Sequence, residues 1–273
     1  MEEIYEKLER LKKYIRDLGK VAVAYSGGVD STFLLKVSKE VLDNNVIAIT
    51  LVSPLYPRSE IEFAKNMAKE LGVRHIIIQE ENIFKNEEFI KNPPDRCYIC
   101  KKMEFREIIK YAKKKGIEYV LDGSNADDLK DYRPGRRALL ELNVKSPLLE
   151  LGFTKEEIRK LSLEYGLPTY NKPSFACLAS RIPYGETITM EELKRIDEGE
   201  EFLRGLGFKQ VRLRSHGSIA RIEVDSESFN IILERREEIL EKLKKLGYIY
   251  VTLDLEGYKM GSMNKILKEK SYE

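Results

Sequence analysis

The stretch Val21-Ala22-Val23-Ala24-Tyr25-Ser26-Gly27-Gly28-Val29-Asp30-Ser31 decides the fold of this 273-residue chain. Its first five residues form the apolar run of a short buried strand, and the pattern after Ser31, to about Leu42, is that of a helix. The two glycines between them let the backbone approach a phosphate group closely, and the N-terminus of the following helix offers free N–H groups to an anion. This strand–loop–helix unit predicts nucleotide binding.

Polar side chains in the same loop add possible ligands. Ser26 and Ser31 can donate hydroxyl protons, and Asp30 can hold Mg²⁺ or orient a substrate. The loop lacks the Gly-Lys-Ser/Thr of a Walker A motif, and no Gly-x-Gly-x-x-Gly follows a strand. The alternative is an ordinary glycine-rich turn, and the strand before the loop and the helix after it favour the phosphate loop.

Outward from this loop, strand-like and helix-like segments alternate. Residues 1–20 are an acidic, amphipathic stretch that predicts a docked helix rather than a signal peptide. The pattern predicts strands at 46–52, 75–78 and 119–121, helices at 59–71 and near 101–115, and an irregular proline-containing stretch before the latter. Such alternation implies right-handed βαβ units and a parallel sheet, with the ligand at the carboxyl ends of its strands.

The segment Leu121–Asp128 follows the last of these strands and should lie at the same sheet edge, where Ser124 could face the nucleotide or the acceptor. A solvated acidic turn is the alternative. Residues 122–147 look loop-rich. Thr154 and Glu157 then form a capping-box pattern that begins a helix, which Gly166 and Pro168 end.

After about residue 170 the pattern changes. We expect a helix at 190–206, strands at 210–214 and 220–224 around a turn at His216-Gly217, a helix at 235–246 and a strand at 248–253. The predicted fold is therefore α/β: a parallel-sheet nucleotide domain over residues 1–170 and a smaller α+β domain over 171–273. We expect the latter to serve substrate binding or oligomerisation, and the active site to lie between the two.

Composition excludes several classes of function. The chain has 48 basic and 46 acidic residues, and a net charge of +2 is too small to argue for nucleic acid or an anionic membrane. No apolar run approaches the roughly 18 residues of a membrane span. A cytoplasmic protein is expected, and disulfides are rare in that compartment. The three cysteines therefore call for metal binding, catalysis or simple burial.

Two cysteines, Cys97 and Cys100, form a Cys-x-x-Cys whose thiolates can converge on one metal or cluster edge. The third, Cys177, would by itself be interpreted as a small buried residue. A zinc ion would want a fourth ligand. The only histidines, His75 and His216, have no metal-ligand spacing to a cysteine.

The loop 26–31 resembles the PP-loop of the ATP pyrophosphatase superfamily. That resemblance implies that a substrate oxygen attacks the α-phosphorus of ATP and that AMP and pyrophosphate are formed. With five further stretches, the chain resembles the LarE family over nearly its whole length. The stretches are RCYICK (96–101), DGSNADDLKDYRPGRRA (122–138), SPLLELGFTKEEIRKLSLEYGLPT (146–169), KPSFACLASRIPYGETIT (172–189) and GYKMGSMN (257–264).

The LarE family comprises ATP-dependent sulfur transferases known for assembly of the nickel-pincer nucleotide cofactor. The resemblance implies a small, nucleotide-like acceptor whose carboxylate is adenylated and then converted to a thiocarboxylate, with sulfide or another sulfur donor. It also implies a homo-oligomer. A tRNA thiolase or an amide ligase of the same superfamily is an alternative, as is a non-catalytic sensor of ATP or redox state.

The cysteines distinguish two branches of this family. In some members one cysteine, matching Cys177, gives up its own sulfur. This chain adds Cys97 and Cys100, and members with three such cysteines hold a [4Fe-4S] cluster, which leaves one iron open for a hydrosulfide. The resemblance therefore implies Cys97, Cys100 and Cys177 as cluster ligands. A sacrificial Cys177 and a zinc site remain alternatives.

Basic residues suggest an acceptor site. Arg212 and Arg214 alternate on a strand and so share one face, and Arg181 follows the third cysteine. Arginine forks suit phosphate oxygens. The resemblance points to the same region, with Ser180 and Glu200, for acceptor binding or subunit contact. A solvated strand face with ion pairs is the alternative. Three further arginines in the central loop could hold phosphates or merely rim the site: Arg133, Arg136 and Arg137.

Overall fold

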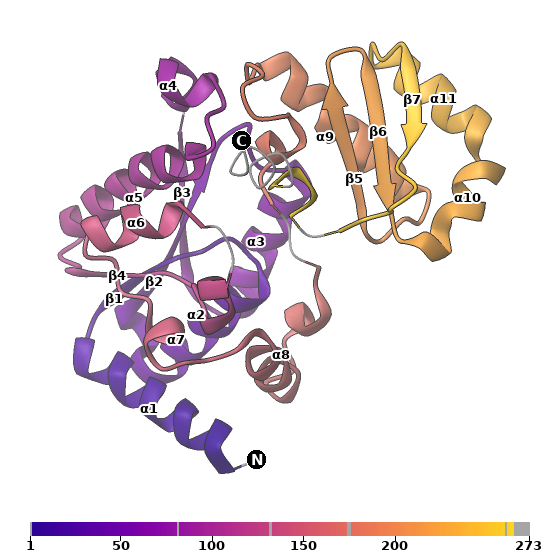
Figure 1. Cartoon of the computed structure of the whole chain (residues 1–273). Helices are drawn as coiled ribbons and strands as arrows, with labels where there is room; N and C mark the ends of the chain where they lie inside the picture. Colours follow the sequence, from indigo (N-terminus) through magenta and orange to yellow (C-terminus); the bar gives the residue numbers. More distant parts are fainter. Residues whose placement is uncertain (1, 81, 131–132, 174–175, 260, 265–273) are drawn as a thin grey trace. The chain divides into compact units, whose positions relative to one another are not determined.

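The computed structural model describes residues 2–80, 82–130, 133–173, 176–259 and 261–264. The chain divides into two compact units. The first comprises residues 1–53, 58–85 and 95–175, and the second comprises 54–57, 86–94 and 176–273. Figure 1 traces both along the sequence. Among the described residues, none of the helices is both long and apolar enough to cross a membrane.

The first unit is built on four parallel strands in the order β3-β2-β1-β4. The strands are β1 (Val21–Ala24), β2 (Val46–Val52), β3 (Arg74–Gln79) and β4 (Tyr119–Leu121). Successive strands are added on one side of β1 until β3, and the chain then returns to place β4 on the other side. The strand order therefore reverses between β1 and β4, and this is the point where open α/β sheets bind ligands.

Helices cover both faces of this sheet. The unit's helices are α1 (Glu2–Leu18), α2 (Val29–Leu42), α3 (Arg58–Glu70), α5 (Arg96–Lys114), α6 (Gly135–Glu141), α7 (Pro147–Glu150) and α8 (Lys155–Glu164), with short 3₁₀ turns at Asp43–Asn45, Ile83–Lys85, Ala126–Lys130 and Pro168–Asn171. One core holds Leu11, Phe33 and Phe153 from α1, α2 and the turn before α8. The other holds Phe105 and Leu139 from α5 and α6. Alternate residues of β1 point into the two cores, as a strand requires.

The second unit contains a smaller sheet in the order β5-β6-β7. Its elements are α4 (Glu87–Ile90), α9 (Met190–Gly205), β5 (Val211–His216), β6 (Ile219–Val224), α10 (Phe229–Glu234), α11 (Arg236–Lys245) and β7 (Tyr250–Leu253), with 3₁₀ turns at Leu178–Arg181, Ser226–Ser228 and Ser262–Asn264. Strands β5 and β6 form an antiparallel hairpin, and β7 pairs in parallel with β6. Gly199 lets α9 lie directly on β5, because a Cβ there would overlap Leu213.

This architecture confirms the predicted α/β fold class, a parallel sheet followed by a smaller mixed α+β part. Two local expectations were wrong. Helix α5 begins at Arg96 rather than near Lys101, because Pro93-Pro94-Asp95 ends the irregular stretch and starts the helix, so Cys97 and Cys100 are helical. The region 122–147, expected as loop, contains α6, which packs on α5. In the quoted motifs, Asp131, Tyr132, Ser174, Phe175 and Met260 lie outside the described residues.

Candidate active site

The glycine loop lies at the carboxyl end of β1, at the reversal of strand order. Gly27 has a positive φ of 72°, and a Cβ on it would lie 2.9 Å from Cβ of Ala64 in α3. Only glycine satisfies both the backbone conformation and this close packing. Gly28 is the N-cap of α2 in an extended conformation and has no side chain to occupy the helix N-terminus. The loop therefore leaves N–H groups of the first turn for an anion.

The two serines of the loop hold its shape. Oγ of Ser26 lies 3.1 Å from Oγ of Ser31, and Ser31 Oγ also accepts from the backbone N–H of Ser26 at 3.3 Å. The backbone N–H of Gly28 donates to Ser26 Oγ at 3.3 Å. These hydrogen bonds are long and therefore weak. Each hydroxyl can give up its present partner and bind a phosphate oxygen at a small cost in free energy.

Asp30 is held by a lysine from a distant helix. Nζ of Lys155, the first residue of α8, donates to Oδ2 of Asp30 at 2.5 Å. Oδ1 of Asp30 is buried and makes no hydrogen bond within the part of the chain that the structure describes. Burial raises the pKa of Asp30, while the ammonium of Lys155 acts in the opposite direction. The carboxylate thus keeps one oxygen for a further cation or donor.

The segment after β4 closes the other side of the loop. Gly123 packs so tightly that a Cβ on it would lie 3.0 Å from the backbone nitrogen of Ser31. Asp122 accepts from the hydroxyls of Ser124, at 2.5 Å, and of Ser146, and burial raises its pKa. The predicted ligand Ser124 therefore lies beside the loop with its hydroxyl proton directed at Asp122.

A second lysine contacts the loop from the end of the first unit. Nζ of Lys172 donates to the carbonyl oxygen of Gly27 at 3.1 Å, and it forms an ion pair with Glu60 at 2.9 Å. The same ammonium lies 3.5 Å from the ring centroid of Phe63. Burial lowers the pKa of Lys172, although Glu60 acts against that shift. Its partners on α3 and its bond to Gly27 fix the loop against that helix.

Sequence reasoning missed both lysines. A signal existed for Lys155, because a cation at the first position of a helix lies at the unfavourable end of the helix dipole. For Lys172 the only local signal is its position before Pro173. Neither contact follows from spacing, since both lysines are more than a hundred positions from the loop.

The three cysteines carry thiols rather than disulfides, and they are divided between the two units. Cys97 is exposed on the first turn of α5, and Cys100 lies one turn later, with its thiol donating to Oε1 of Glu104 at 3.3 Å. Residues three apart share a helix face. Cys177 is half-buried in the second unit, directly before the turn Leu178–Arg181. No group of three or more His, Cys, Asp or Glu side chains is arranged to hold a metal ion within the described residues.

The arginines of β5 are buried, so the solvated strand face considered for them is wrong. Arg212 is 4% and Arg214 5% exposed. Arg214 donates to both carboxylate oxygens of Glu223, at 2.9 and 2.8 Å. Arg212 donates to the carbonyl oxygen of Val211 at 2.8 Å, and burial together with the guanidinium of Arg181 lowers its pKa to about 10. Arg212 therefore remains a cation in surroundings where an added anion would be stabilising.

The remaining candidate residues are less suited to a ligand. His75 packs edge-on against Tyr25 and lies 2.7 Å from Oγ1 of Thr50. Arg133 pairs with Asp128 at 3.0 Å, and the guanidinium of Arg137 stacks 3.6 Å from the ring centroid of Tyr98. These contacts are those of surface and packing residues.

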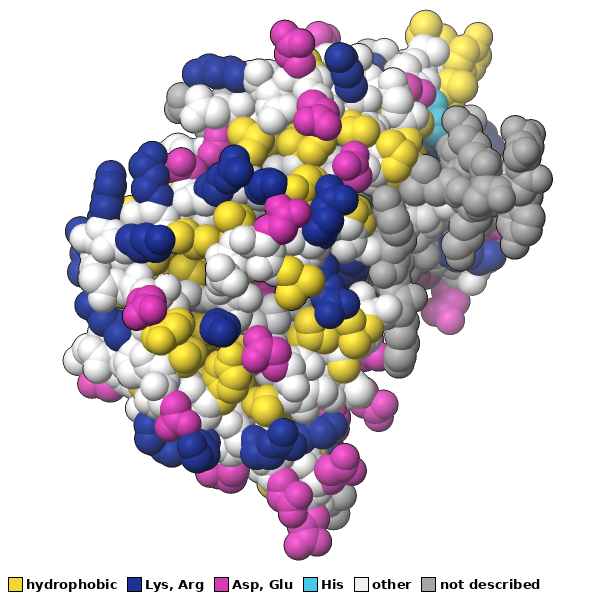
Figure 2. Space-filling model, turned by 60° about the vertical axis from the view of Figure 1, so that its left-hand side comes forward, with side chains coloured by type: hydrophobic (Ala, Val, Ile, Leu, Met, Phe, Trp, Pro, Cys, Tyr) yellow, Lys and Arg dark blue, Asp and Glu magenta, His cyan; other side chains and the backbone are white. Residues whose placement is uncertain are grey.

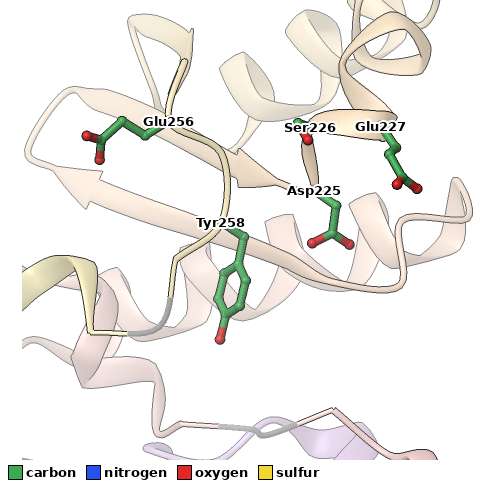
Figure 3. Close-up of a pocket in the computed structure, with 5 residues that line it drawn as sticks. All are labelled: Asp225, Ser226, Glu227, Glu256 and Tyr258. Atoms are coloured by element: carbon green, nitrogen blue, oxygen red, sulfur yellow. The ribbon is translucent and has the colours of Figure 1, made fainter.

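An acidic pocket in the second unit does not suit a nucleotide. It has a volume of about 320 Å³ and is lined by Asp225, Ser226, Glu227, Glu256 and Tyr258, which come from the segments after β6 and β7 (Figure 3). Three carboxylates would repel a triphosphate. On the face shown in Figure 2, basic and acidic side chains are interspersed, in agreement with the small net charge.

Comparison with known proteins gives two kinds of match. The family model described as asparagine synthase matches residues 9–167. An uncharacterised protein of Synechocystis sp. is 43% identical over 96% of this chain and 98% of its own length. The pyridinium-3,5-bisthiocarboxylic acid mononucleotide synthase of Lactiplantibacillus plantarum is 39% identical over 93% of this chain and 92% of its own length. An uncharacterised protein of Methanocaldococcus jannaschii is 34% identical over 93% of this chain and 98% of its own.

Proposed function

This chain belongs to the asparagine synthase family of PP-loop proteins and, within it, to the LarE-type family, and we propose that it is an ATP-dependent sulfurtransferase that adenylates a carboxylate and then replaces its oxygen with sulfur. The relative from Lactiplantibacillus plantarum is named for a pyridinium-bisthiocarboxylic acid mononucleotide. We propose an acceptor of that kind, a small nucleotide-like carboxylate. The observation that carries the proposal is the glycine loop at the reversal of strand order, with Asp30 and Lys155 at its edge.

ATP binding is supported by the chemistry of the loop. The free N–H groups of α2 and the glycines suit the phosphates, and two lysines bring positive charge to a loop that has no lysine of its own. In the proposed step an oxygen of the acceptor carboxylate forms a bond to the α-phosphorus. The bond from that phosphorus to the bridging oxygen breaks, and pyrophosphate leaves with the electron pair. The acyl adenylate is a better electrophile than a bare carboxylate.

Mg²⁺ fits this site. Oδ1 of Asp30 is buried without a hydrogen bond among the described residues, and carboxylate oxygens are ligands that Mg²⁺ accepts. When bound, the ion would neutralise charge on the phosphates. Lys155 would shield the other oxygen of Asp30 and keep the carboxylate ionised.

We propose that the C-terminal region, residues 171–273, binds the acceptor, and that residues 1–170 form the adenylating domain. Arg212 supports this assignment, because its cation is buried beside another guanidinium and would gain from a phosphate. Arg214 donates to Glu223, to the carbonyl oxygen of Ser180 and to the hydroxyl of Ser262. We therefore propose that Arg214 holds these neighbouring residues in place and does not bind the acceptor itself. We also propose that this region carries the contacts of a homo-oligomer.

A [4Fe-4S] cluster fits the donor set of this chain. Three thiols that are not in disulfides are present, and two of them lie one helical turn apart on α5. Cys97, Cys100 and Cys177 would hold it, and three protein ligands are one fewer than a closed cluster uses. When bound, it would supply the sulfur for transfer. A sacrificial Cys177, whose own sulfur is transferred, is the competing form of the same function.

The proposal is tested by the products made from ATP. Anaerobic protein with Mg²⁺, sulfide and a pyridinium carboxylate mononucleotide should release AMP and pyrophosphate in equal amounts and convert the carboxylate to a thiocarboxylate. Without the acceptor, AMP release should fall to background. ADP and phosphate as main products would overturn the cleavage mode. AMP release with ammonia, giving an amide but no thiocarboxylate, would identify an amide ligase instead.

A further inference from the structure

Arg181 is completely buried in the second unit. Its exposed fraction is 0%, which is rare for arginine because removal of a guanidinium from water is costly. Nε and Nη2 donate to the two carboxylate oxygens of Glu200, at 2.7 and 2.9 Å. Nη1 donates to the carbonyl oxygens of Ala176, at 2.7 Å, and Cys177, at 3.1 Å, and to the hydroxyl of Ser180 at 2.9 Å. All three nitrogens are thus engaged within the chain.

Glu200 connects this arginine to the rest of the unit. It lies on α9, where Gly199 permits close contact with β5, and one of its oxygens accepts from the backbone N–H of Leu213 at 3.0 Å. Arg204, one turn along α9, donates to the other oxygen at 3.1 Å. The ion pair of Arg181 with Glu200 therefore anchors the main chain around Cys177 to both α9 and β5.

A second arginine holds the same turn at its other end. Nη1 of Arg214 donates to the carbonyl oxygen of Ser180 at 2.9 Å. The turn from Cys177 to Arg181 is thus fixed at two carbonyl oxygens, Cys177 and Ser180, by guanidinium groups whose own positions depend on buried carboxylates. The half-buried thiol of Cys177 therefore lies on a main chain that these two guanidinium groups hold in place.

We propose that Arg181, with Glu200 as its counter-ion, is a positioning residue that fixes the main chain of Cys177 and so sets where its sulfur is presented, and that Arg181 does not contact the acceptor. The inference rests on the proposed function for its chemical meaning. Arg181 is 0% exposed, and each of its three nitrogens already donates to a carboxylate, a carbonyl or a hydroxyl, so an anionic ligand could reach it only by displacing these partners. A shift of about 1 Å in a reacting group can slow a reaction by roughly two orders of magnitude.

The test measures the position of Cys177 without relying on sulfur transfer. In the full-length chain, Cys97→Ser and Cys100→Ser leave Cys177 as the only thiol. Its rate of alkylation by iodoacetamide is followed by intact-protein mass spectrometry. Arg181→Lys keeps the charge beside Glu200, but one ammonium cannot reach the carboxylate and both carbonyls. The matched control is Arg204→Lys, which changes the other arginine that donates to Glu200 and lies on α9 rather than in the turn.

Arg181→Lys should raise the alkylation rate of Cys177 by about threefold or more, because the turn opens more often, and Arg204→Lys should leave it unchanged. Equal rates in the parent chain and in Arg181→Lys would overturn the proposal. If Arg181→Lys does not fold, Arg181→Met combined with Glu200→Met removes the pair without leaving a lone buried charge, and the same rise is expected.

Steady-state kinetics give a second readout in the chain with all three cysteines. Arg181→Lys should lower kcat for thiocarboxylate formation by about tenfold and leave the KM of the acceptor unchanged. A raised KM with unchanged kcat would make Arg181 an acceptor ligand and overturn the inference. If the parent chain forms no thiocarboxylate at all, the proposed function fails, while the alkylation comparison still decides the role of Arg181.

Discussion

Nζ of Lys155 lies 2.5 Å from Oδ2 of Asp30, so α8 supplies the glycine loop with a cation that the loop's own sequence lacks. The backbone N–H of Lys155 also donates to Oδ2 of Asp127, at 2.8 Å, which ties the start of α8 to the segment after β4. A lysine at a helix N-terminus works against the helix dipole. Its position is therefore explained by the carboxylate it contacts and by the triphosphate proposed to bind beside it.

We predict that Lys155→Met weakens ATP binding by about tenfold or more, since a charge-assisted hydrogen bond contributes about 1.5–3 kcal/mol. Burial raises the pKa of Asp30 and Lys155 opposes this, so removal of the lysine should raise that pKa further. AMP formation, which needs the ionised carboxylate, should then be lost at a higher pH on acidification. Isothermal titration with a non-hydrolysable ATP analogue and pH–rate profiles measure the two effects.

Lys160→Met is the matched control for this experiment. Lys160 is an exposed residue of the same helix, so its replacement removes an equal charge without touching Asp30. Equal ATP affinity in Lys155→Met and Lys160→Met would show that Lys155 serves the fold alone.

The two arginines of β5 should respond differently to replacement. Arg214→Ala leaves Glu223 fully buried with a much weaker set of partners, and we expect a loss of about 3 kcal/mol in the free energy of unfolding. Arg212→Ala removes a cation that is repelled by Arg181 and Arg214 as well as attracted by Glu200, so we expect it to cost less stability than Arg214→Ala. The effect of Arg212→Ala on acceptor affinity should be about tenfold or more, with ATP affinity unchanged. Urea unfolding measures the stability of the two variants, and titration measures their affinity for the acceptor. A larger loss of stability in Arg212→Ala, with a larger loss of acceptor affinity in Arg214→Ala, would refute the roles proposed for these two arginines.

The parts of the site that follow from local chemistry could be predicted from the sequence. The run before Ser26, the glycines and the capping box of Thr154 with Glu157 each specify their conformation within a few residues, and both capping-box bonds are present. Contacts between distant segments could not be predicted. Nothing near Lys172 indicates that its ammonium bonds the carbonyl oxygen of Gly27.

The burial of the β5 arginines, like the contacts between distant segments, could not be predicted from the sequence. Arginines are mostly exposed, so a strand with Arg212 and Arg214 suggests a solvated or ligand-binding face. The buried carboxylate of Glu223, opposite on β6, makes a third interpretation possible, because an ion pair with several hydrogen bonds can be accommodated inside a domain.

A pH dependence of stability should arise from His75. The single hydroxyl proton of Thr50 is directed to the carbonyl oxygen of Tyr25 at 2.5 Å, so Nε2 of His75 carries a proton and donates to Thr50. Burial, with a smaller effect of Lys65, lowers the pKa of His75 to about 4 from its ordinary 6.5. Between these values the unfolded chain binds more protons, so the free energy of unfolding falls as pH falls from about 6.5 to 4.

We predict that His75→Gln reduces the change in the free energy of unfolding between about pH 6.5 and 4 by about 1 kcal/mol. This value is smaller than the full pKa shift implies, because the imidazole is partly exposed and solvent screens its charge. Glutamine keeps an N–H donor for Thr50. Urea unfolding at several pH values compares the variant with the parent. Carboxylates such as Asp30 titrate in the same way in both chains, so their contribution cancels in the comparison. The same slope in both chains would place the pKa of His75 near its ordinary value.

The last prediction concerns the source of the transferred sulfur. Cys97 and Cys100 share a face of α5, and Cys177 lies on a turn held by buried arginines, so all three are placed by well-packed elements rather than by chance in loops. Anaerobically reconstituted protein should contain about four irons and four sulfides per chain. Replacement of any one cysteine by alanine should lower that content and sulfur transfer, while AMP formation largely persists.

The decisive measurement is the mass of the polypeptide after several turnovers with added sulfide. Cys177 should remain cysteine, because the sulfur comes from outside the chain. Conversion of Cys177 to dehydroalanine, one per product formed, would instead identify Cys177 as the consumed donor and exclude the cluster as the sulfur source.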